Sequence, residues 1–188
     1  MNIIERVKNI LLNPKYEWEI IKDEVITVQE LFTNYAVFLA AIPAVAGWIG
    51  YSFSGWLPVG SSFGWAIVTY ILSLVGAFLV GYIIDAFATT FGSTKDLTSS
   101  MKVSVYASTA SWVGGIFNLF SFLSFLSLIA GIYTLVLMYF GLKIVKDVPD
   151  DKATGYFITV VVVSIVIYLI IGAITSALFL TSYAVSGL

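Results

Sequence analysis

Asp85 is the acidic residue of this sequence that stands apart from the other charged residues. It lies in an apolar stretch about six residues before a polar segment, which corresponds to about 9 Å along a helix that rises about 1.5 Å per residue. A carboxylate at the centre of a membrane helix costs about 2.5–3.5 kcal/mol, so such a group is usually paired or functional. Lys102 is expected at a similar depth in the next helix and could pair with it, and Lys143 is a second cationic candidate.

Asp85, Lys102, Lys143 and Tyr106 form the candidate polar site of this chain. In a functional interpretation, the site is an ion or proton relay, or a polar site open to the cytoplasm. In a structural interpretation, Asp85 and Lys102 form a salt bridge between two helices, and the long Lys102 side chain reaches the membrane edge. A single acid whose base lies at the membrane edge favours the structural interpretation.

The residue types that are missing exclude much enzyme chemistry. The sequence has no Cys and no His, which removes thiolate metal sites, cysteine nucleophiles and the usual general base. It also lacks a second intramembrane Asp, a glycine-rich phosphate loop and an EF-hand. We therefore predict that the protein is not an enzyme and has no catalytic, cofactor-binding or metal site. The net charge of −2 argues against binding to nucleic acid.

The composition places the chain in a lipid bilayer. Apolar residues make up 60% of it and charged residues 11%, against about half and about a quarter in soluble domains. Charged residues are absent from Leu31 to Ile84, from Val103 to Leu142 and from Ala153 to Leu188. Because a membrane-spanning helix needs about 20 residues, the first two intervals each hold two helices and the third holds one.

We therefore predict an all-α integral membrane protein with five transmembrane helices. The expected spans are about 31–53, 63–90, 98–117, 121–145 and 154–181. They form one domain over residues 27–188, which follows a cytoplasmic segment over residues 1–26. Small residues such as Gly81, Gly115 and Gly131 recur at helical spacing, which favours packing seams over substrate sites. The same seams could serve self-association or contact with other membrane proteins.

The basic residues predict the orientation of these spans. They form three clusters outside the charge-free intervals, namely Arg6, Lys8, Lys15 and Lys22, then Lys95 and Lys102, then Lys143, Lys146 and Lys152. Five alternating spans put all three clusters on one side of the membrane, and basic loops stay in the cytoplasm. We expect a multi-pass protein of the cytoplasmic (inner) membrane, in contact with the lipid bilayer, with its N-terminus in the cytoplasm and its C-terminus outside.

The first 26 residues predict an amphipathic helical hairpin. Ile3, Val7 and Ile10 have helical spacing and lie opposite charged residues. Asn13-Pro14 is typical of an N-cap followed by proline in the first helical turn, so a second helix begins there. The apolar face of the hairpin either lies on the cytoplasmic membrane surface or packs under the helical bundle.

Several segments spread over nearly the whole chain resemble one known family. They are Ile4–Trp18, Ala40–Pro43, Asp85–Asp96, Tyr106–Thr109 with Trp112 and Phe117, and Pro149–Tyr156. With these segments the chain resembles the Yip family, the membrane proteins that interact with Ypt/Rab GTPases, and in particular its compact prokaryotic branch. The resemblance implies five spans, a cytoplasmic N-terminus and a role in membrane organisation through partners. The long N-terminal region of the eukaryotic relatives is missing here, so Rab binding is not implied.

Two functions follow as hypotheses from these patterns. The first is a non-enzymatic multi-pass membrane protein that organises membrane lipids or partner proteins, which the short loops, small-residue seams and N-terminal hairpin favour. The alternative is a small transporter or channel that uses the intramembrane Asp85 with Lys102.

Overall fold

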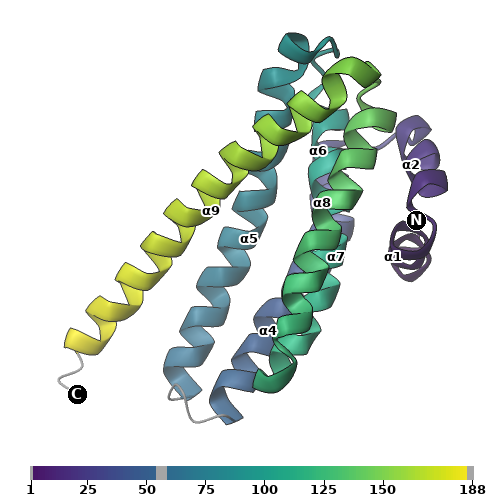
Figure 1. Ribbon diagram of the computed structural model, residues 1–188. Helices are drawn as coiled ribbons and strands as arrows, with labels where there is room; N and C mark the ends of the chain where they lie inside the picture. Colours follow the sequence, from purple (N-terminus) through teal and green to yellow (C-terminus); the bar gives the residue numbers. More distant parts are fainter. Residues whose placement is uncertain (1, 54–58, 186–188) are drawn as a thin grey trace.

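The computed structural model describes residues 2–53 and 59–185, and these residues form helices without any strand (Figure 1). The elements in chain order are α1 (Ile3–Leu12), α2 (Pro14–Asp23), α3 (Val28–Leu31), the π-helix η1 (Phe32–Ala36), α4 (Val37–Phe53), α5 (Val59–Phe87), the 3-10 helix η2 (Ala88–Phe91), α6 (Leu97–Ala107), α7 (Thr109–Gly114), the 3-10 helices η3 (Gly115–Leu119) and η4 (Ser121–Leu123), α8 (Phe125–Val145) and α9 (Asp150–Val185). The prediction of an all-helical protein is confirmed. Residues 1, 54–58 and 186–188 of the two predicted domains lie outside this description.

Four helical segments of the described chain are long and apolar enough to cross a membrane. They are Val28–Phe53, Ser62–Phe91, Phe125–Val145 and Asp150–Ala173. The predicted span 98–117 does not form one continuous α-helix, because it divides into α6, α7 and η3. The number of five spans is therefore not confirmed.

The division of the predicted third span occurs at Ser108. The Ser108 hydroxyl donates to the carbonyl of Ser104 at 2.8 Å, a contact that competes with regular helix geometry. One turn later the backbone amide of Ser111 donates to the Thr134 side chain of α8 at 3.1 Å. The neighbouring helix thus supplies a hydrogen bond where the helix is interrupted.

Two close helix contacts occur at glycines that the sequence places in packing seams. A Cβ added to Gly81 of α5 would lie 2.4 Å from the Met101 sulfur of α6. A Cβ added to Gly115 of η3 would also lie 2.4 Å from the Pro43 Cβ of α4. Only a residue without a side chain permits such approach, so these two seams are used for packing within the chain.

The first two helices pack against the side of the bundle, next to α7 and α8 (Figure 1). The Asn2 side chain caps α1 by accepting hydrogen bonds from the backbone amides of Ile4 and Glu5. Pro14 occupies the first turn of α2, and Trp18 of α2 is fully buried. On α8, the Tyr133 hydroxyl donates to the carbonyl of Leu11 at 2.9 Å. We call α1 and α2 the N-terminal helix pair.

Candidate functional site

Arg6 of α1 is the centre of a buried charge network. Its side chain is 9% exposed, and its two terminal nitrogens lie 2.6 Å from the Glu17 carboxylate of α2 and 2.9 Å from the Glu24 carboxylate just after α2. Its guanidinium carbon lies 5.4 Å from the centre of the Tyr106 ring of α6. A guanidinium can satisfy two carboxylates and an aromatic face together, so Arg6 joins α1, α2 and α6.

Lys102 of α6 closes the carboxyl end of α2. Its ammonium nitrogen donates to the carbonyl oxygens of Ile21 at 2.8 Å, Lys22 at 3.3 Å and Glu24 at 2.5 Å. The last carbonyls of a helix lack partners within the helix and carry the negative end of its dipole. A lysine from another helix thus adds to the capping of α2, where the Glu24 amide also donates to the carbonyl of Ile21 at 3.3 Å.

Tyr106 lies one turn after Lys102, on the same side of α6. Its hydroxyl donates to the second Glu24 oxygen at 3.0 Å, so Glu24 receives hydrogen bonds from both Arg6 and Tyr106. The Tyr106 ring contacts Trp18 and Tyr35 edge-to-face, with ring centres 6.4 and 4.9 Å apart. Such pairs contribute beyond the area that they bury, so Tyr106 links the charge network to the aromatic core.

The predicted pairing of Asp85 with Lys102 is wrong. Asp85 instead accepts a hydrogen bond from Ser100 at 3.3 Å. Met101 and Ser104 of α6 face α5, where they contact Gly81 and the Ala77 carbonyl. Lys102 is turned about 100° from Met101 around the helix axis, and it therefore faces α2.

Lys146, immediately after α8, lies near Asp85 at the same end of the bundle. Its ammonium nitrogen donates to the carbonyls of Thr94 at 2.8 Å and Asp96 at 3.2 Å. Burial lowers the pKa of Lys146 below its usual value, and the nearby carboxylates of Asp85 and Asp96 oppose that shift. Lys146 thus holds the segment between η2 and α6 against the end of α8.

Lys143 belongs to neither of these groups. Its ammonium nitrogen lies 2.6 Å from an oxygen of Asp150, and the Lys143 side chain is partly exposed while that of Asp150 is exposed. The structure therefore joins Lys102 to Tyr106 through Glu24 and places Asp85 and Lys143 in separate contacts.

The comparisons with known proteins agree with this architecture. The family profile of the Yip1 domain matches residues 8–183. The chain belongs to the Yip1 family. Among curated proteins, this Yip1-family chain is similar to the inner membrane protein YohC of Escherichia coli strain K12 and of strain O6:H1. Each is 20% identical over 188 residues, which covers 94% of this chain and 96% of the relative.

No solved structure matches this chain significantly. The matching family, its inner membrane relatives and the apolar helices identify a Yip1-family membrane protein. The resemblance that the sequence motifs indicated is confirmed.

Sequence reasoning missed three members of the network in this Yip1-family protein: Arg6, Glu17 and Glu24. The sequence feature that could have indicated them is a charged residue on the apolar face of a helix. Arg6 lies one turn before Ile10, and Glu17 lies one turn before Ile21. One Glu17 oxygen is buried without a hydrogen-bond partner in the described part of the chain. Within residues 2–53 and 59–185, no group of three or more acidic, His or Cys side chains is arranged to hold a metal. The contacts of the network join α1, α2 and α6.

Proposed function

We propose that this protein is a non-enzymatic inner membrane protein that organises membrane lipids or partner proteins through its N-terminal helix pair. The observation that carries the proposal is that buried charges fasten the pair from within, while large apolar side chains remain exposed on its outer surface among charged ones. Ile4, Leu12 and Tyr16 are 81%, 67% and 69% exposed. Exposed large apolar side chains beside the basic Lys8 and Lys15 suit a lipid interface or a membrane partner.

The proposed topology has five crossings, with α6, α7 and η3 together as the third. The N-terminus and residues 1–26 lie in the cytoplasm, and the C-terminus lies outside. Support comes from the three basic clusters, which lie on one side of the membrane when two spans separate each cluster from the next. Reporter fusions at the C-terminus and after residue 96 test this topology, because a C-terminal reporter that is active only in the cytoplasm contradicts it.

Native mass spectrometry tests the proposed activity. The protein is released from nanodiscs of phosphatidylethanolamine and phosphatidylglycerol, and the lipids or protein partners that remain bound are measured. A double variant, Leu12→Ser with Tyr16→Ser, is expected to lose the bound molecules, whereas the control Glu19→Gln keeps them. Recovery of neither lipid nor partner with the wild-type protein contradicts the proposal.

The transporter alternative was based on a pair of Asp85 with Lys102. In the structure Lys102 instead binds carbonyls of α2, and Asp85 binds Ser100. We therefore do not propose transport. A flux through proteoliposomes that Asp85→Asn abolishes is the observation that would restore this alternative.

A further inference from the structure

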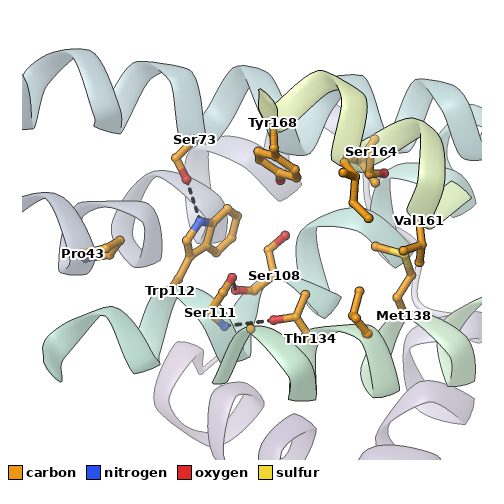
Figure 2. A pocket seen from close by; sticks show the side chains of 14 residues that line it. Pro43, Ser73, Ser108, Ser111, Trp112, Thr134, Met138, Val161, Ser164 and Tyr168 are labelled. Carbon is orange, nitrogen blue, oxygen red and sulfur yellow. Dashed lines mark hydrogen bonds between the residues drawn. The ribbon is translucent and has the colours of Figure 1, made fainter. Parts of the chain in front are cut away.

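An uncharged cavity lies among the long helices on the side of the bundle away from the N-terminal helix pair (Figure 2). Its volume is about 450 Å³, within the range of about 300–1,000 Å³ that is typical of small-molecule sites. The walls come from α4, α5, α7, α8 and α9 and from Ser108 between α6 and α7. Small side chains on facing helices, including Ser108, Gly131 and Ser164, leave this volume unfilled.

Most polar groups in the wall are already engaged within the protein. The Trp112 indole nitrogen donates to the Ser73 hydroxyl at 2.8 Å, and the Thr134 hydroxyl accepts from the Ser111 amide (Figure 2). Thr134 also donates to the carbonyl of Ala130 at 3.2 Å. The Thr134 hydroxyl therefore retains capacity only as an acceptor, because its single proton is already donated.

Ser164 of α9 differs from the other hydroxyls of the cavity. Its side chain is 7% exposed, and its oxygen has no hydrogen-bond partner among the described residues. A buried hydroxyl without a partner costs about 1–3 kcal/mol, so a polar group of a ligand would recover this energy. Tyr168 lies one turn further along α9 and lines the same cavity (Figure 2).

Among the described residues, the cavity wall has no charged side chain, and some of its side chains also face outward. Leu135 of α8 and Ile165 of α9 line the cavity and are 36% and 52% exposed, so it is accessible from the apolar surface of these helices. An ionised group would enter an apolar, uncharged site at a large desolvation cost. A ligand from the lipid phase is therefore neutral, largely hydrocarbon and equipped with a hydrogen-bonding group.

We propose that this cavity binds a neutral hydroxylated lipid, such as a diacylglycerol. The lipid enters between α8 and α9, its chain fills the apolar part of the volume, and its hydroxyl or ester group pairs with Ser164. The hydroxyls of Ser108, Ser111 and Thr134 already donate their protons to backbone carbonyls, so one of their oxygens accepts the hydroxyl proton of the lipid. This site is separate from the surface of the N-terminal helix pair, so the inference and the proposed function can fail independently.

Photolabelling of the full protein in nanodiscs tests the inference. The probe is a diacylglycerol with a diazirine in one acyl chain, and unlabelled diacylglycerol serves as competitor. The expected result is competed labelling of peptides from α7, α8 and α9. Ser164→Ala is expected to weaken binding about fivefold, which corresponds to about 1 kcal/mol for one neutral hydrogen bond.

A matched pair of glycine variants separates occupation of the cavity from general effects. A Cβ at Gly131 or at Gly172 meets no atom within 4 Å, and only Gly131 lines the cavity. Gly131→Leu is therefore expected to block the competed labelling, and Gly172→Leu to leave it unchanged.

Three results would overturn the inference. The first is competed labelling that neither Ser164→Ala nor Gly131→Leu reduces, since the lipid would then lie elsewhere. The second is equal labelling by a phosphatidylglycerol probe with the same chains, because the site would not select a neutral group. The third is an absence of competed labelling, because no lipid of this class would then occupy the cavity.

Discussion

The two sides of α8 present opposite ways of placing polar groups among apolar helices. On one side, Arg6 and Lys102 are buried with partners from three helices, and Trp18 closes the space. On the other, neutral hydroxyls surround a cavity of about 450 Å³, and Ser164 has no partner among the described residues. Charges must be paired when they are buried, whereas neutral hydroxyls can persist beside unfilled volume at a smaller cost.

The difference indicates which side holds the structure together and which side can accept a ligand. The stability of the protein depends strongly on both partners of a buried ion pair, because removal of one partner leaves an uncompensated charge. The stability of the protein depends less on a cavity with neutral walls, and a ligand can enter such a cavity without breaking a contact. The structure thus separates a fastened side, formed by the N-terminal helix pair with α6, from an accessible side between α8 and α9.

Arg6→Met tests the fastened side most strongly. It leaves the buried Glu17 and the partly buried Glu24 carboxylates without their cation, so we expect a loss of about 3–5 kcal/mol in the free energy of unfolding. SDS titration of the purified protein measures this loss, and limited proteolysis measures release of the N-terminal helix pair. Lys8→Met is the control on the exposed face of α1 and should stay within about 0.5 kcal/mol of wild type. Equal stabilities of the two variants would contradict a fastening role for Arg6.

Lys102→Met tests the cap of α2. The carbonyls of Ile21 and Glu24 lose their buried donor, and an unsatisfied buried group costs about 1–3 kcal/mol. We expect faster amide hydrogen exchange in the last turn of α2, with little change in α9. Lys95→Met, at an exposed position of the neighbouring basic cluster, is the control. Unchanged exchange in α2 would show that its end is stable without Lys102.

Two glycines of α8 compare the two sides within one helix. A Cβ at Gly141 would lie 3.0 Å from the Trp18 ring, so Gly141→Ala should destabilise the protein by about 1–3 kcal/mol. A Cβ at Gly131 meets no atom within 4 Å, so Gly131→Ala should stabilise the helix by about 0.5–1 kcal/mol. Unfolding in SDS measures both changes. Effects of the same sign would remove the contrast between the sides.

The smallest expected effect concerns Lys22 and Asp147, which lie 2.5 Å apart and connect α2 to the segment after α8. The hydrogen bond to Asp147 raises the pKa of Lys22 above its usual 10.5, against a smaller opposing effect of burial. Protonated Lys22 therefore stabilises the folded state below about pH 10.5, and this contribution disappears as the pH rises through the raised pKa. An exposed pair contributes about 0–1 kcal/mol. The stability difference between wild type and Lys22→Met should shrink between about pH 9 and about pH 12, and a constant difference would contradict the pairing.

The cavity and the charge network differ in how well the sequence predicts them. Hydropathy and helical spacing indicated the membrane helices, and Lys102 was selected because it is expected at a depth similar to that of Asp85. The partners of Lys102 and Tyr106 were not predictable, because these partners lie on α2 and the link after it, whose docking against α6 is a property of the packed chain. Asp85 was assigned the wrong partner for the same reason, since depth in a helix does not specify the direction of a side chain around it.

The sequence by itself determined that this is a helical membrane protein of the Yip1 family. Composition, charge-free intervals and motifs are properties of consecutive residues, and the bilayer requires such segments to satisfy their own backbone hydrogen bonds as helices. Only the tertiary structure decided that the predicted third span divides at Ser108, that Arg6 lies between two carboxylates and that Ser164 faces a cavity. These features depend on the rotation and approach of helices that are distant in the chain, which local spacing does not encode.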